Sequence, residues 1–266
     1  MHNKVLYGRC EQVLAELPPD IVQTTVTSPP YWTLRDYNMD GQIGLERTVD
    51  EYVGNLCRVF EQVHRVTRQE GTLWLNLGDT YNAYNGNRGP SRGMSRGADE
   101  ARPKWGRGQG LTVPTLTNKN LLGLPWRVAF ALQQAGWVLR NEIIWYKTHS
   151  MPERVKDRCK RAHETIFLFS KQERYFFNKD EIKDDLSRTV WSIEPESYSG
   201  AHFAVFPSEI PRRCVRLSTA PGDLVLDPFA GSGTTLAVAK ATGREYLGVE
   251  LNPAYQAFIE ARLEAK

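Results

Sequence analysis

The chain has 266 residues and a formal net charge of +3, and 41% of its residues are hydrophobic and 11% aromatic. This composition excludes a disordered chain, and no apolar stretch approaches the roughly 18 residues that a membrane-spanning helix needs. The length suits one large domain or two small ones, and we expect a single domain over 1–266. A charge this small does not identify a nucleic-acid-binding protein, because the distribution of charge over the surface decides that.

The cysteines, the histidines and the N-terminus predict a cytoplasmic protein. The 4 cysteines are widely spaced without a C-x-x-C pair, so neither a zinc site nor a disulfide framework is indicated. The 5 histidines show no ligand spacing, and we expect no metal. The first residues, MHNKVLYGRC, lack the apolar core of a secretory signal, and we expect no membrane association.

Strand-like and helix-like segments alternate along the chain. Runs rich in β-branched and aromatic residues predict strands at 21–26, 71–78, 139–146, 164–170, 223–227 and 245–250. Apolar residues at helical spacing predict helices at 49–67, 124–136 and 234–243. This alternation predicts an α/β fold with a doubly wound, mostly parallel sheet.

The first predicted strand leads into the sequence Ser28-Pro29-Pro30-Tyr31-Trp32. Proline has no backbone N–H, so the two prolines present only carbonyl acceptors on a rigid backbone, and the serine hydroxyl adds another acceptor. Such a corner suits a ligand with two N–H donors, such as the exocyclic amine of a nucleobase. We predict that Tyr31 and Trp32 stack on this base. A rigid turn that only ends a strand is the alternative.

The chemistry of such an amine explains why acceptors matter. Its lone pair is conjugated into the ring, which makes it a poor nucleophile. If the Ser28 hydroxyl and the Pro29 carbonyl accept its two hydrogens, the nitrogen turns toward tetrahedral geometry and its lone pair is freed to attack a methyl group. A base in a duplex must leave the helix to reach this site.

Two segments between predicted strands carry much of the basic charge. Residues 86–110 hold seven glycines and six Lys or Arg residues, and we predict a flexible basic loop over 86–118. The segment 148–200 is the predicted target-recognition region. A solvated insertion without a binding role is the alternative for the loop. The residues that we predict to contact DNA are Arg88, Arg92, Arg96, Arg102, Lys104, Arg107, Lys147, Arg154 and Lys156.

A glycine-rich turn follows the strand 223–227 in the sequence DPFAGSGTT, and Glu250 ends the strand after it. A strand, a glycine turn and a helix let the backbone approach a ligand closely, and a carboxylate at Glu250 suits the two hydroxyls of a ribose. The turn lacks the third glycine of G-x-G-x-x-G and the G-K-[ST] of a phosphate-binding loop. It therefore fits an adenosine ligand without pyrophosphate, such as S-adenosylmethionine.

The motifs TSPPYW and DPFAGSGTT, with GVELNP after them, together resemble those of amino-group DNA methyltransferases. The catalytic motif precedes the cofactor motif, which is the circularly permuted order of the β subgroup, and the resemblance spans nearly the whole chain. It implies a Rossmann-like methyltransferase fold with a catalytic half over 1–80 and a cofactor-binding half over 201–266. The implied contacts to S-adenosylmethionine are Asp227, Pro228, Phe229, Gly231, Gly233, Thr234, Glu250, Asn252, His202 and Phe203.

The resemblance also implies a reaction and partners. Members with S-P-P-Y mostly methylate cytosine N4 and members with D-P-P-Y mostly methylate adenine N6, so we predict cytosine N4 in double-stranded DNA, with adenine N6 as the alternative. Asp79 is predicted to bond the catalytic serine or the cofactor, or else to end a strand. Enzymes of this subgroup often form homodimers, and a cognate restriction endonuclease is a further expected partner.

Other classes remain as alternatives. A non-catalytic DNA-binding relative would predict decay of the motif residues, and here all of them are present. An RNA or protein methyltransferase would share the cofactor half. The serine, the motif order and the remaining blocks favour DNA.

Overall fold

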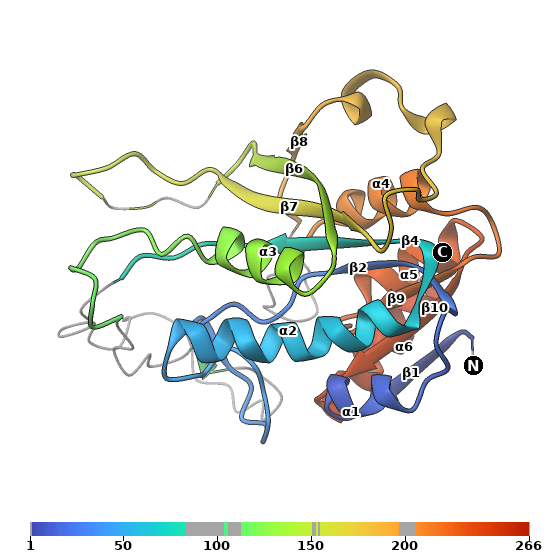
Figure 1. The fold of residues 1–266 in the computed structure, drawn as a ribbon, viewed down its shortest axis with the longest axis horizontal. Helices are drawn as coiled ribbons and strands as arrows, with labels where there is room; N and C mark the ends of the chain where they lie inside the picture. The colour runs from blue at the N-terminus through green and yellow to red at the C-terminus, as the bar shows by residue number, and fades with distance from the viewer. Residues whose placement is uncertain are drawn as a thin grey trace.

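The computed structural model describes residues 2–82, 113–150, 153, 155–196 and 206–265, together with the backbone of 104–105. Its centre is an 8-stranded sheet with the order β1, β10, β9, β2, β4, β7, β6, β8 (Figure 1). The strands span Lys4–Tyr7 (β1), Val22–Thr27 (β2), Thr67–Leu77 (β4), Val138–Lys147 (β6), His163–Ser170 (β7), Val190–Ile193 (β8), Leu224–Asp227 (β9) and Glu245–Glu250 (β10). A separate pairing joins β3 (Arg35–Asp36) to β5 (Lys104–Trp105).

The directions of the strands confirm the predicted mostly parallel sheet. Neighbouring strands from β1 to β4 are parallel, and β8 is parallel to β6. Only β7 in this sheet runs antiparallel to its neighbours β4 and β6. The carboxyl ends of the parallel strands and the amino end of β7 therefore meet at one edge, where α/β proteins bind their ligands.

Helices cover both faces of the sheet, as a doubly wound fold requires. One buried cluster packs the sheet against α1, α2 and α3, and a second packs it against α4, α5 and α6. In Figure 1, α2 and α3 lie in front of the sheet and α5 and α6 behind it. The helices span Cys10–Ala15 (α1), Val49–Val66 (α2), Leu124–Gln134 (α3), Glu209–Ser218 (α4), Thr234–Ala241 (α5) and Gln256–Glu264 (α6), and short 3-10 turns span Lys179–Glu181, Asp184–Ser187 and Pro253–Tyr255.

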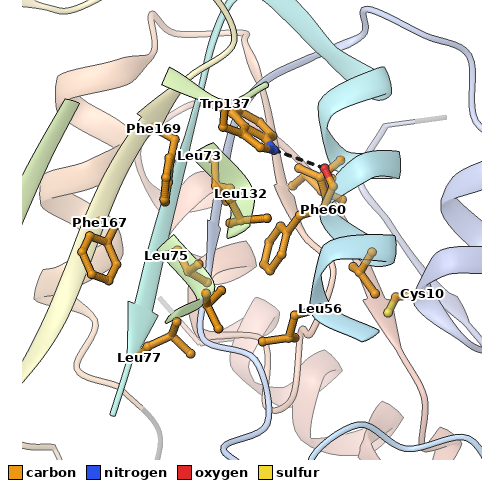
Figure 2. Close-up of a cluster of buried hydrophobic side chains, with 14 of the residues drawn as sticks. Cys10, Leu56, Phe60, Leu73, Leu75, Leu77, Leu132, Trp137, Phe167 and Phe169 are labelled. Atoms are coloured by element: carbon orange, nitrogen blue, oxygen red, sulfur yellow. Dashed lines mark hydrogen bonds between the residues drawn. The ribbon is translucent and has the colours of Figure 1, made fainter. Parts of the chain in front are cut away.

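The front cluster is built from alternate residues of β4 and one face of α2. Figure 2 shows Leu73 and Leu75 of β4 facing Leu56 and Phe60 of α2. Each such fully buried side chain contributes about 1.5–3 kcal/mol relative to an exposed one. The indole of Trp137 donates a hydrogen bond to the Phe60 carbonyl at 3.4 Å, which satisfies its only polar atom inside this core (Figure 2).

A capping box begins α2. The end of this helix lies directly before β4, so β4 begins earlier than predicted. The Thr48 hydroxyl accepts from the Glu51 amide, and the Glu51 carboxylate accepts from the Thr48 amide. The helix ends at Val66, and β4 follows at once from Thr67 instead of beginning at 71. The Thr67 hydroxyl donates to the Val63 carbonyl at 2.7 Å, so it satisfies a carbonyl of the last turn.

The prediction omitted the helices α1, α4 and α6 and the strands β1, β3, β5 and β8. The helix α4 carries Pro211 in its first turn and several arginines, and α6 has no apolar stripe of its own to mark it. The short strand β8 lies at the edge of the sheet beside β6. Of the helices in the described ranges, none is both long and apolar enough to cross a membrane.

Candidate active site

The sheet places the two predicted motifs beside each other. The strands β2 and β9 are hydrogen-bonded neighbours, and both end at the ligand-binding edge. At these ends the Thr27 hydroxyl donates to the Asp227 carboxylate at 2.6 Å, and both residues are 1% exposed. The Thr235 hydroxyl of α5 also donates to the Val26 carbonyl at 3.1 Å. Ser28 therefore follows directly after a residue bonded to the cofactor motif.

Some backbone carbonyls of the S-P-P-Y corner accept hydrogen bonds from the protein, and one does not. The Pro30 carbonyl accepts from the Tyr52 hydroxyl of α2 at 2.9 Å, and the Tyr31 carbonyl accepts from the Leu34 amide at 3.2 Å. Within the described part of the chain, nothing donates to the Pro29 carbonyl. The corner is thus held to α2 by one proline carbonyl and keeps the other as an open acceptor.

A polar cluster surrounds the hydroxyl of Ser28, and we call Ser28, Tyr31, Asn76, Lys147 and Glu164 the Glu164 cluster. The Ser28 hydroxyl donates to the Tyr31 hydroxyl at 3.3 Å, which in turn donates to Glu164 Oε2 at 2.6 Å. The Asn76 amide donates to the Tyr31 hydroxyl and to Glu164 Oε2, both at 2.9 Å. The Lys147 ammonium donates to Glu164 Oε1 at 2.5 Å.

The ring and hydroxyl of Tyr31 are both fixed. Burial, then the charge and hydrogen bond of Glu164, raise the pKa of the Tyr31 phenol well above its usual value, so the phenol is neutral near pH 7. A Cβ at Gly78 would lie 2.6 Å from Cε2 of the Tyr31 ring. The glycine after β4 therefore lets this ring pack closely against the backbone.

Two residues predicted to act beside Ser28 have structural partners instead. Trp32 is 3% exposed, packs in the front cluster and donates its indole N–H to the Glu46 carbonyl at 3.0 Å, which argues against stacking on a base. The Asp79 carboxylate accepts from the amides of Thr80, Gly123 and Leu124 at 2.8–3.1 Å. It therefore caps the start of α3, and no described hydrogen bond joins it to Ser28.

The cofactor motif is organised around two carboxylates, the buried Asp227 and the half-buried Glu250. Asp227 Oδ1 accepts from the Phe229 amide at 3.1 Å as well as from Thr27. Glu250 accepts from the amides of Gly231 at 2.8 Å and Asn252 at 2.9 Å. Burial raises the pKa of Asp227 to about 6 and the pKa of Glu250 to about 7, against the lowering effect of these amides.

The remaining residues of the turn position its backbone. Gly231 has φ of 52°, and among the described residues a Cβ there would meet only the Phe229 carbonyl, at 3.8 Å. Gly233 has φ of 80° and precedes α5, against Ile259 of α6. Pro228 is buried, and the Thr234 hydroxyl accepts from Arg262. The Asn252 side chain caps a 3-10 turn through the Ala254 amide at 3.0 Å.

Several predicted contacts cannot be located. The residues outside the described ranges are Arg88, Arg92, Arg96, Arg102, Arg107, Arg154, His202 and Phe203, and the side chain of Lys104 is also undescribed. Lys156 is exposed. The ammonium of Lys147 is held by Glu164 and lies 4.6 Å from the centre of the Trp145 ring, which differs from the predicted phosphate contact. In the described ranges, no group of three or more His, Cys, Asp and Glu side chains is arranged to hold a metal.

Four residues at this edge were not among the predicted site residues: Thr27, Tyr52, Asn76 and Glu164. Asn76 is the second-last residue of β4 and Glu164 is the second residue of β7, so both lie at the ligand-binding edge. A signal existed for Glu164. The segments 139–146 and 164–170 are joined without an intervening helix, which predicts an antiparallel pair and places the start of the second strand beside the end of the first.

The matches to known proteins identify the same class of protein as the motif residues and the fold. Residues 22–261 match the family of N6/N4 DNA methylases, and the chain belongs to this family of DNA methyltransferases. The type II methyltransferase M.Cfr9I of Citrobacter freundii is 43% identical over 267 residues, covering 97% of this chain and 87% of the relative. M.XycI of Xanthomonas campestris pv. cyanopsidis is 44% identical with the same coverage. The chain is thus an amino DNA methyltransferase of the restriction-modification kind.

Solved structures show the same fold. The protein TTHA0409 of Thermus thermophilus, complexed with S-adenosyl-L-methionine, is 28% identical with a TM-score of 0.68, covering 97% of this chain and 93% of that one. The cytosine-N4-specific PvuII DNA methyltransferase has a TM-score of 0.76 at 21% identity, covering 100% of this chain and 88% of its own. At that identity the PvuII structure supports the fold alone.

The packing of Tyr31 against Gly78 generates a test of the site. In Gly78→Ala the new methyl group must displace the Tyr31 ring, and displacement by about 1 Å near a reacting centre costs on the order of 100-fold in rate. We expect the initial rate of methyl transfer to DNA to fall by this order while the melting temperature changes little. Gly54→Ala in α2, where a Cβ meets nothing within 4 Å, is the control. Equal rates for both variants would show that the position of the ring is unimportant.

Proposed function

We propose that this protein transfers a methyl group from S-adenosylmethionine to the exocyclic N4 amine of a cytosine extruded from duplex DNA. The new N–C bond replaces the C–S bond of the methyl group, S-adenosylhomocysteine leaves, and the acidic methylated amine releases one proton to water. The observation that carries the proposal is the short hydrogen bond between Thr27 and Asp227, at 2.6 Å, which joins the acceptor corner to the cofactor motif. The acceptors for an amine and the glycine turn for an adenosine ligand thereby lie at the same edge of the sheet.

The corner supplies the two acceptors that the amine needs. The hydroxyl oxygen of Ser28 and the open carbonyl of Pro29 belong to adjacent residues on a backbone fixed by two prolines. Accepting both N–H groups there withdraws the nitrogen lone pair from conjugation and directs it outward. The Tyr31 ring, held by its hydroxyl and by Gly78, offers an aromatic surface for the extruded base.

The turn and its carboxylates fit S-adenosylmethionine. Glu250 is a half-buried carboxylate whose pKa is raised chiefly by loss of solvation, and neutral ribose hydroxyls suit it better than a negatively charged phosphate. Beyond its chain neighbours, no side chain of the described residues lies within 4 Å of a Cβ at Gly231, which supports close approach of a ligand to the backbone there. The cofactor supplies an electrophilic methyl group on a positively charged sulfur, and Asp227 and Glu250 give this edge the opposite charge. The complex of TTHA0409 with the same cofactor supports this assignment.

The choice of cytosine N4 over adenine N6 rests on Ser28 in the S-P-P-Y motif. A hydroxyl accepts from either amine, so adenine N6 is the alternative on the same geometry. The regions 86–118 and 148–200 are proposed to contact DNA, with Lys156 as an exposed basic residue of the second region. Four further features stay predictions: a single domain with a catalytic half over 1–80 and a cofactor-binding half over 201–266, a homodimer, a cognate restriction endonuclease and a cytoplasmic location.

The identity of the methylated nucleoside shows which amine the protein methylates. The protein is incubated with S-adenosylmethionine labelled in its methyl group and with unmethylated genomic DNA of mixed sequence, and the DNA is then digested to nucleosides. We expect the label in N4-methylcytosine. Label in N6-methyladenine would establish the alternative, and label confined to RNA or protein in a parallel incubation would contradict both.

The raised pKa of Glu250 predicts a pH-dependent affinity for the cofactor. Only the ionised carboxylate accepts from both ribose hydroxyls, and with a pKa of about 7 in the free protein the ionised fraction falls as pH falls. The Kd for S-adenosylmethionine, measured by calorimetry, should rise about fourfold from pH 8 to pH 6.5. Glu250→Gln should bind weakly, and its Kd should change by less than about 1.5-fold in this window, because Asp227 with a pKa of about 6 stays largely ionised. A wild-type Kd that is equal at both pH values would exclude the role of Glu250.

A further inference from the structure

We propose that Glu164, anchored by Lys147, is a positioning residue that sets the direction of the hydrogen bonds around Ser28, so that the serine presents acceptors to the substrate amine. The inference rests on the proposed function and deepens it, because it assigns the origin of the acceptor character of the catalytic corner. Neither Glu164 nor Lys147 belongs to the catalytic or the cofactor motif.

Glu164 and Lys147 are held firmly at the edge of the site. They lie at the start of β7 and the end of β6, and their side chains are 14% and 24% exposed. The ammonium of Lys147 bonds Glu164 Oε1 at 2.5 Å and lies over the ring of Trp145. The pair leaves Glu164 Oε2 as the oxygen that faces Tyr31 and Asn76. A partly buried carboxylate with a cation on its other side is a fixed acceptor.

From this acceptor the direction of each hydrogen bond follows. An ionised carboxylate has no hydrogen to give, so the hydrogen of the Tyr31 hydroxyl must point to Glu164, at 2.6 Å. The Tyr31 oxygen can then only accept, and it accepts from Asn76 at 2.9 Å and from Ser28 at 3.3 Å. The single hydrogen of the Ser28 hydroxyl is thereby directed toward Tyr31. Asn76 Nδ2 donates to one lone pair of the Ser28 oxygen at 3.4 Å, and the other lone pair remains for a donor of the substrate.

The substrate amine brings only donors to this corner. A serine whose hydrogen pointed at the amine would oppose one hydrogen with another and would leave its lone pairs turned away. With the hydrogen directed to Tyr31, the Ser28 oxygen can accept from the amine as the Pro29 carbonyl does. Glu164 thus acts on the substrate through two hydroxyl groups without contacting it.

Asn76 is oriented by the same carboxylate. Its Nδ2 donates to Glu164 Oε2, and a flipped amide would place an oxygen against that oxygen. Its own Oδ1 has no partner in the described part of the chain, although the residue is only 2% exposed. An unpaired buried acceptor is costly, so the fixed orientation of Asn76 indicates that the carboxylate outweighs that cost.

Replacing Glu164 by glutamine tests the proposed direction of the hydrogen bonds from Ser28 through Tyr31 to Glu164. The glutamine oxygen would turn to the donor-only Lys147, and its NH₂ group would face Tyr31, whose hydrogen would then turn to Ser28 and occupy the acceptor. We expect Glu164→Gln to lower the single-turnover rate on the order of 100-fold. The Kd values for S-adenosylmethionine and for DNA should stay within about twofold, because the interaction acts in the transition state. Glu142→Gln on β6 is the matched control with an unchanged rate.

A double-mutant cycle with Tyr31→Phe separates this role from a general effect on folding. Tyr31→Phe keeps the ring and removes the hydroxyl through which Glu164 acts, so it should lower the rate to a similar extent. Adding Glu164→Gln to Tyr31→Phe should then change the rate by less than about threefold. Independent, multiplying losses would overturn the inference. If Glu164→Gln does not fold, a full rate in Tyr31→Phe alone would also overturn it.

The outcomes distinguish the inference from the proposed function. If the wild type places no label on a DNA amine, the proposed function fails. If the wild type and Glu142→Gln methylate a DNA amine and Glu164→Gln is equally fast, the proposed function stands and the inference alone fails.

Discussion

The buried hydrogen bond from Thr27 to Asp227 is the interaction on which the rest of the site depends. It joins the carboxyl ends of β2 and β9, so a corner that begins at Ser28 and a turn that begins at Asp227 open at the same place. The parallel direction of these strands makes the meeting unavoidable, because their carboxyl ends share one edge of the sheet. The order of the motifs along the chain is therefore irrelevant to their proximity.

Near this bond, some hydrogen-bond acceptors stabilise the fold and others are proposed to bind the substrate. The Pro30 carbonyl is used by Tyr52 and the Asp79 carboxylate caps α3, so these groups hold the scaffold. The Ser28 hydroxyl and the Pro29 carbonyl are the acceptors proposed to meet the substrate. Glu164 extends the division to hydrogen positions, since its fixed negative charge draws the nearby hydrogens away from the corner.

The sequence predicts much of this arrangement and misses what depends on side-chain neighbours. Strand ends, glycine turns and acceptor-only prolines have local signatures, so the α/β fold, the mostly parallel sheet and the position of Glu250 follow from the pattern. Trp32 is different, since its burial depends on how the chain after the prolines folds back to Glu46. The role of Glu164 likewise needs the antiparallel place of β7 between β4 and β6.

Replacing the serine hydroxyl tests the central claim most directly. Ser28→Ala removes one acceptor and leaves the prolines, Tyr31 and the Thr27 to Asp227 bond in place. The measurement is the single-turnover rate of methyl transfer to DNA together with the Kd for S-adenosylmethionine. The account predicts a loss of rate on the order of 100-fold with an unchanged Kd. A rate equal to that of the wild type would contradict it.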